Sequence, residues 1–101
     1  MQFLVFGYDG TDAAAPKRRL DARPAHNELL KKLKDEGRHQ CAAALLDEKE
    51  QMVGSVIITD FPDREALNAW LEKEHYVVQK VWEKVEVKTC RISPVFFSTT
   101  L

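Results

Sequence analysis

Two apolar segments separated by a short polar one constrain this chain most strongly. Gln40–Leu46 is apolar in its interior, and Val53–Phe61 is rich in β-branched residues, which favour strands. Between them stands Asp47–Glu50, in which every residue is charged, as suits the tip of a hairpin. The pattern therefore predicts two antiparallel strands that pair with each other.

The residues before this hairpin predict a strand and a helix. Phe3–Tyr8 is short, rich in aromatic residues and apolar on both faces, which is typical of a central strand. Turn residues follow it in Asp9–Asp12. Ala25–Glu36 carries leucines on one face and charges on the other, so we expect a helix there. Ala13–Leu20 fits either a loop or a first helical turn, and Pro24 fits the first turn of a helix or a kink within a longer one.

The residues after the hairpin predict a second helix, a short third helix and a fourth strand. Asp63 is placed to cap the second helix. The spacing of four apolar residues predicts the third helix: Val77, Val78, Val81 and Trp82. Val85–Thr89 alternates as a strand does. The order β-α-β-β-α-(α)-β predicts a ferredoxin-like α+β fold with an antiparallel four-stranded sheet, in a single domain of residues 1–101.

One face of such a sheet is left without cover. The helices pack on the other face, and no further element remains. A homodimer that packs sheet on sheet covers the open face, because both subunits contribute the same surface to the interface. The apolar tail from about Ser93 to Leu101 could cover the edge of this dimer interface. On this strand order Cys41 and Cys90 lie on opposite edges, so we expect both to be reduced packing residues.

Composition excludes several classes of protein. The 101 residues have a net charge of −1, which lacks the positive potential of nucleic-acid binders. No apolar run approaches the roughly 20 residues that span a bilayer, and the N-terminus lacks the basic region of a signal peptide. The three histidines do not have metal-ligand spacing. We expect a cytoplasmic protein with no cofactor, no nucleic acid and no membrane, whose partners are a small-molecule substrate and a second copy of itself.

His26 is the residue that packing explains least. It projects between Leu29, Leu30 and Leu33, in the middle of the helix face that should be buried. A buried imidazole needs hydrogen-bond partners. Two interpretations stay open, which are a histidine satisfied within the core and a general acid–base at the floor of a pocket.

Two carboxylates are candidates to orient that imidazole, and with it they are the predicted catalytic residues. Asp9 follows the first strand, and Glu74 lies at the break after the second helix. A carboxylate bonded to one ring nitrogen fixes the tautomer and leaves the other nitrogen free to act. The alternatives are a turn residue for Asp9 and a solvated helix end for Glu74.

Four further residues are predicted to bind substrate. Two arginines before His26 could clamp an anion, although a solvated basic stretch is the alternative. A tyrosine beside Glu74 could contact substrate or only pack. A serine at the head of the third strand lacks the GxSxG elbow of a nucleophile. These residues are Arg19, Arg23, Tyr76 and Ser55.

Several short stretches carry a family resemblance. In chain order they are Arg23-Pro24-Ala25-His26, Asp35-Glu36-Gly37-Arg38, Gly54-Ser55, Tyr76-Val77 and Val85-Glu86-Val87-Lys88. In this order and spacing the chain resembles the YCII-related (YciI-like) proteins of the dimeric α+β barrel group. The resemblance implies a dimeric ferredoxin-like subunit and an active site built on a histidine and an aspartate. The family histidine falls on His26, an acidic position falls on Asp9, and Glu74 stands where relatives carry a second acidic residue.

Two functions follow as hypotheses. The first is a small cofactor-free enzyme that uses a histidine–carboxylate pair on a small anionic or phenolic metabolite, as a lyase, isomerase or hydrolase. The resemblance supports it, because some relatives resemble lyases or dehydrochlorinases that act on hydroxylated aromatic rings. The alternative is a non-catalytic, dimeric small-molecule-binding or accessory module.

Overall fold

The structure, a computed structural model, describes residues 1–96 of the chain. Four strands form one sheet, and they are β1 (Gln2–Asp9), β2 (His39–Leu46), β3 (Met52–Asp60) and β4 (Trp82–Cys90). The helices are α1 (Ala15–Asp35), α2 (Arg64–Leu71), α3 (His75–Val78) and the 3₁₀ helix η1 (Pro94–Phe96). The predicted ferredoxin-like α+β fold is confirmed.

The sheet has the strand order β2-β3-β1-β4, and all neighbouring strands are antiparallel. The apolar β1 is therefore a central strand, as its composition predicts. Cys41 and Cys90 lie on the two edge strands and are both free, as expected, but Cys41 is exposed and is therefore not the packing residue that the sequence predicts.

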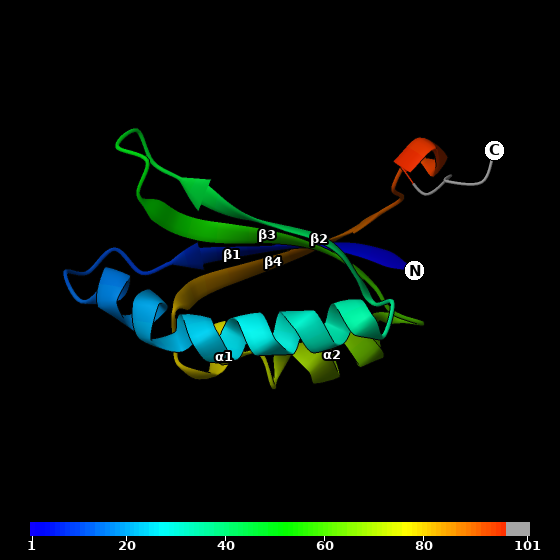
Figure 1. The fold of residues 1–101 in the computed structure, drawn as a ribbon, viewed down its shortest axis with the longest axis horizontal. Helices are drawn as coiled ribbons and strands as arrows, with labels where there is room; N and C mark the ends of the chain where they lie inside the picture. The colour runs from blue at the N-terminus through cyan, green and yellow to red at the C-terminus, as the bar shows by residue number, and fades with distance from the viewer. Residues whose placement is uncertain (97–101) are drawn as a thin grey trace.

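Both long helices lie on one side of the sheet, and the core lies between these two layers (Figure 1). Strand residues alternate between the faces, so Phe3 and Val5 are buried under the helices while Leu4 and Phe6 point the other way and are half-buried. In the part of the chain that the structure describes, no helix or strand covers that second face.

The first helix takes the longer of the two forms that the sequence left open. It begins at Ala15, so its first turn lies in the segment Ala13–Leu20 and Pro24 lies inside the helix. Ala15, Arg19 and Ala22 continue the buried face of α1 toward its N-terminus. Because the charged Arg19 lies on this buried face, apolar periodicity alone does not mark the first part of the helix.

The third helix is shorter than predicted. It ends at Val78, and Lys80 then adopts a positive φ of 58°. Trp82 consequently begins β4 instead of ending a helix. The prediction for Val81 and Trp82 was wrong, because apolar residues at helical spacing also fit a turn followed by a strand.

The start of α2 agrees with the sequence. Asp63 caps the helix, and its side chain accepts a hydrogen bond from the backbone N–H of Ala66 at 2.8 Å. A cap of this kind stabilises a protein by about 1 kcal/mol.

The described part of the tail does not pack on the subunit. Val95 and Phe96 in η1 are 73% and 79% exposed. Residues 97–101 of the predicted apolar tail lie outside the described residues. No helix within residues 1–96 combines the length and the apolar character needed to cross a membrane.

Candidate active site

A buried histidine–glutamate pair lies at the centre of the candidate site. His26 is 5% exposed on the inner face of α1, and the Glu74 side chain is fully buried at the start of α3. His26 Nδ1 is hydrogen-bonded to Glu74 Oε1. A carboxylate accepts hydrogen bonds through its oxygens, so we assign the shared proton to Nδ1 of His26. Among the described residues no hydrogen bond involves the other ring nitrogen, Nε2.

Glu74 is held in place by the backbone that it caps. Its Oε1 also accepts a hydrogen bond from the backbone N–H of Tyr76 at 3.0 Å. The Glu74 side chain is thus fixed as the N-cap of α3. Of the two carboxylates predicted to orient His26, Glu74 is the one in contact with it.

Two aromatic rings fix the plane of the imidazole. The Tyr76 ring stacks on that of His26, with centroids 3.7 Å apart and planes at 8°. The ring of Trp82 meets His26 edge-on, at 6.1 Å and 79°. Burial raises the pKa of Tyr76, against the lowering effect of two nearby arginines, so its hydroxyl stays protonated at neutral pH.

The second predicted carboxylate has a different partner. Asp9 is paired with Arg19, whose Nη1 donates to both carboxylate oxygens at 2.9 and 3.0 Å. Both side chains are almost fully buried. Arg19 Nη2 also donates to Ser55 Oγ at 2.9 Å. Asp9 therefore compensates the charge of Arg19, and no hydrogen bond within residues 1–96 joins it to His26.

Trp82 connects the His26–Glu74 pair with the group formed by Asp9, Arg19 and Ser55. Sequence reasoning did not identify this residue. Its Nε1–H donates to Ser55 Oγ at 3.3 Å, while its ring borders His26 and Tyr76. A Cβ added to Gly7 would lie 2.2 Å from the indole ring, so the ring occupies the space above this glycine. A glycine inside an apolar strand indicates a close approach of this kind, and that signal could have identified an aromatic neighbour.

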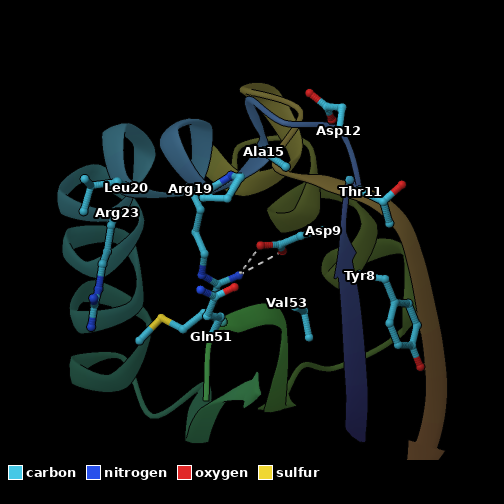
Figure 2. Close-up of a pocket in the computed structure, with 13 residues that line it drawn as sticks. Tyr8, Asp9, Thr11, Asp12, Ala15, Arg19, Leu20, Arg23, Gln51 and Val53 are labelled. Carbon is cyan, nitrogen blue, oxygen red and sulfur yellow. Dashed lines mark hydrogen bonds and ion pairs between the residues drawn. The ribbon is translucent and has the colours of Figure 1, made fainter. Parts of the chain in front are cut away.

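Two hollows adjoin the site. A cavity of about 180 Å³ is bordered by His26, Tyr76 and Ser55. A larger cleft of about 780 Å³ lies between α1, the end of β1 and the start of β3. Figure 2 shows Arg19 crossing this cleft from α1 to Asp9. Arg19 and Arg23 border both hollows.

The structure thus places most predicted site residues together. Six of them line one of the two hollows: Asp9, Arg19, Arg23, His26, Ser55 and Tyr76. Glu74 lies in contact with His26. Within residues 1–96 no group of three or more histidine, cysteine or acidic side chains could hold a metal ion.

The buried Asp9 predicts a pH effect on stability. Burial raises its pKa above the ordinary 3.8, and Arg19 and Arg18 offset this only in part. Compared with the unfolded chain, the folded protein therefore binds the proton of Asp9 more tightly. This contribution to the free energy of unfolding is complete below pH 3.8 and is lost as the pH rises through the raised pKa of Asp9. Asp9→Asn cannot titrate, so the free energy of unfolding of the wild type, relative to this variant, should fall as the pH increases through that window. Urea denaturation of both proteins across the acidic range measures these free energies of unfolding. A wild type that gains stability relative to Asp9→Asn as the pH rises would contradict the raised pKa of Asp9.

The fold belongs to the class of ferredoxin-like α+β proteins, with a histidine–carboxylate pair between helix and sheet. The family model of the YCII-related domain matches residues 1–91. Protein YciI of Escherichia coli O6:H1 (strain CFT073) is 34% identical over 94 residues, which cover 87% of this chain and 94% of that protein. Protein YciI of Shigella flexneri matches with the same values. The chain belongs to the YCII-related family, as the resemblance implies.

Solved structures share the fold at lower identity. One is 5-chloro-2-hydroxyhydroquinone dehydrochlorinase (TftG) from Burkholderia phenoliruptrix AC1100, in complex with 2,5-dihydroxybenzoquinone. It has a TM-score of 0.79 and 19% identity, and the match covers 94% of this chain and 98% of that one. A dimeric ferredoxin-like protein of unknown function from Jannaschia sp. CCS1 has a TM-score of 0.53 and 14% identity, with 90% and 98% covered. These likenesses concern the fold alone.

Proposed function

We propose that this protein is a small-molecule enzyme in which His26 and Glu74 act as an acid–base pair without a cofactor. The observation that carries the proposal is the buried contact between Nδ1 and Glu74 Oε1. It leaves Nε2 as the nitrogen able to exchange a proton, in a residue that borders a cavity. A histidine satisfied within the core would also need a hydrogen-bond partner, but it would not need a hollow beside its ring.

The substrate that this pair suits best is a small phenolic or otherwise anionic ring compound. Nε2 would remove a proton from a ring hydroxyl, and the buried Glu74 carboxylate would stabilise the imidazolium that forms. The imidazolium would return this proton to the ring carbon that carries the leaving group, which gives a keto tautomer. Departure of the leaving group from that carbon as an anion, together with loss of a proton from a second ring hydroxyl, then gives a quinone. The fold shared with a dehydrochlorinase supports this lyase chemistry over isomerisation or hydrolysis.

Ser55 would bind a substrate oxygen in this scheme. Its Oγ accepts hydrogen bonds from Arg19 Nη2 and Trp82 Nε1. A hydroxyl oxygen has two acceptor sites and one proton, so the Ser55 O–H remains free to donate. Asp9 would then act as a positioning residue, because it holds Arg19 rather than the reacting atoms.

A turnover assay with Glu74→Gln tests the proposal. The panel consists of hydroxyquinols and hydroquinones with and without ring chlorine, followed by absorbance and by chloride release. The wild type should convert at least one chlorinated member, and the variant should lower kcat about 100-fold, because a neutral amide does not stabilise the imidazolium. Glu72→Gln, an exposed residue on the same connection, is the matched control and should retain the wild-type rate. Equal rates in both variants, or no conversion of any member by the wild type, would favour the binding-module alternative.

We also propose that a second copy of the chain covers the open face of the sheet. This face presents four half-buried apolar residues of β1 and β3, which are Leu4, Phe6, Val56 and Ile58. These residues form one continuous apolar patch, and such a patch favours an apolar partner surface. The same face of a second copy, related by a twofold axis, is such a surface. A structural neighbour described as dimeric supports the formation of a dimer.

Light scattering with Phe6→Glu tests this assembly. The wild type should have the mass of a dimer. The variant should have the mass of a monomer, because the Glu carboxylate at position 6 would be buried at the centre of the dimer interface. Lys31→Glu, on the exposed face of α1, is the control and should remain dimeric. A monomeric wild type, or a dimeric Phe6→Glu variant, would contradict the proposal.

A further inference from the structure

The large cleft beside the candidate active site carries a positive charge that has no ion-pair partner within the described residues 1–96. Arg19 and Arg23 border this cleft, and only one of them has an ion-pair partner among the described residues. Arg19 is buried against Asp9, and its two terminal nitrogens are engaged by Asp9 and Ser55. Arg23 is exposed one helical turn later, and the described residues give it no ion-pair partner. Arg23 is therefore the cation available to an anionic ligand.

Arg23 also stands where the two hollows join. It borders the small cavity that contains His26 and the cleft that reaches the hairpin. Met52 borders both hollows as well. A ligand with its ring beside His26 would thus pass Arg23 before it enters the cleft.

The cleft beyond Arg23 offers apolar surface. Leu20 on α1 is 67% exposed, while Met52 and Val53 at the start of β3 are 38% and 42% exposed. Met52 and Val53 both line the cleft. The small cavity holds little more than one ring, whereas about 780 Å³ lies within the usual range for ligand pockets. The space therefore suits a ligand larger than a bare hydroxyquinone.

We propose that the substrate is an amphipathic aromatic acid, with its hydroxylated ring beside His26, its carboxylate or other anionic group at Arg23, and an apolar substituent against Met52 and Val53. This inference rests on the proposed function for the position of the ring. It adds the substrate class, because an unpaired guanidinium selects an anion and exposed apolar side chains select a hydrocarbon group.

Affinities of three probes test the proposal without requiring turnover. The probes are 2-hydroxybenzoate, 2-hydroxy-5-pentylbenzoate and the methyl ester of the second, each measured by titration calorimetry on the full-length protein. The pentyl acid should bind at least about tenfold more tightly than 2-hydroxybenzoate, because five methylene or methyl groups leave water. The ester should bind about tenfold more weakly than the pentyl acid, because it lacks the charge that pairs with Arg23.

Two variants separate the anion subsite from the apolar one. Arg23→Gln should remove the preference for acid over ester and leave the affinity for the ester unchanged. Val53→Asn should remove the advantage of the pentyl group and leave the affinity for 2-hydroxybenzoate unchanged. Lys17→Gln on α1 and Val85→Asn on β4 are exposed controls outside the cleft, and both should behave as the wild type.

The results distinguish this inference from the proposed function. Equal affinities for the three probes, or an unchanged preference in Arg23→Gln, would overturn the substrate class even if hydroxyquinones are converted. The expected affinity pattern would support the substrate class even if His26 proves not to be catalytic.

Discussion

His26→Asn should lower turnover of any substrate of this protein by at least about 1,000-fold across the pH range, with the fold retained. Asparagine can still donate a hydrogen bond to Glu74 from its amide, so the buried carboxylate keeps a partner. The amide does not exchange a proton near neutral pH, so acid–base catalysis is lost. Alanine is the less informative choice, because it would leave the Glu74 carboxylate buried without this hydrogen bond and destabilise the protein.

Steady-state kinetics and thermal denaturation of the same preparations measure both effects. His75→Asn is the matched control, since this partly buried histidine of α3 has no contact with the Glu74 carboxylate among the hydrogen bonds of residues 1–96, and its kcat should equal that of the wild type. A His26→Asn variant that keeps the wild-type kcat would show that the imidazole is a core residue only.

Gly7→Ala should lower the free energy of unfolding by about 3 kcal/mol, at the upper end of the usual effect of overpacking. The added Cβ would lie 2.2 Å from Cδ2 and Cε2 of Trp82. The indole cannot move freely, because it contacts His26 and Tyr76 and donates a hydrogen bond to Ser55. The clash should therefore also disturb the candidate site, which chemical denaturation and binding of a 2-hydroxybenzoate probe would both detect.

A double-mutant cycle attributes the effect to this contact. Trp82→Leu removes the ring, so Gly7→Ala should cost much less in that background than in the wild type. Gly37→Ala is the control, because nothing lies within 4 Å of its added Cβ and only its φ of +75° opposes alanine. That variant should lose about 1 kcal/mol. Additive losses in the cycle would mean that the two residues do not interact in the proposed way.

The candidate site was predicted in part. His26 was identified because an imidazole interrupts a row of leucines, and Glu74 was one of two carboxylates considered for it. Asp9 was considered on the same grounds, and local sequence cannot show that its partner is Arg19. Trp82 was placed in a helix, because an apolar spacing near a turn does not indicate whether a helix continues.

The sequence by itself determined the order of strands and helices, the hairpin, the capped start of α2 and the exceptional position of His26. Each depends on local periodicity or on the chemistry of one residue, which a chain shows without folding. The tertiary structure decided which carboxylate meets the imidazole and that an indole fills the space above Gly7. It also decided that Arg19 is paired with Asp9, while Arg23 has no ion-pair partner within residues 1–96. Those contacts join residues far apart in the chain, and they form only when α1, the sheet and α3 pack together. Burial of a polar group costs free energy unless it is hydrogen-bonded, so the partner that packing supplies decides the role of each group.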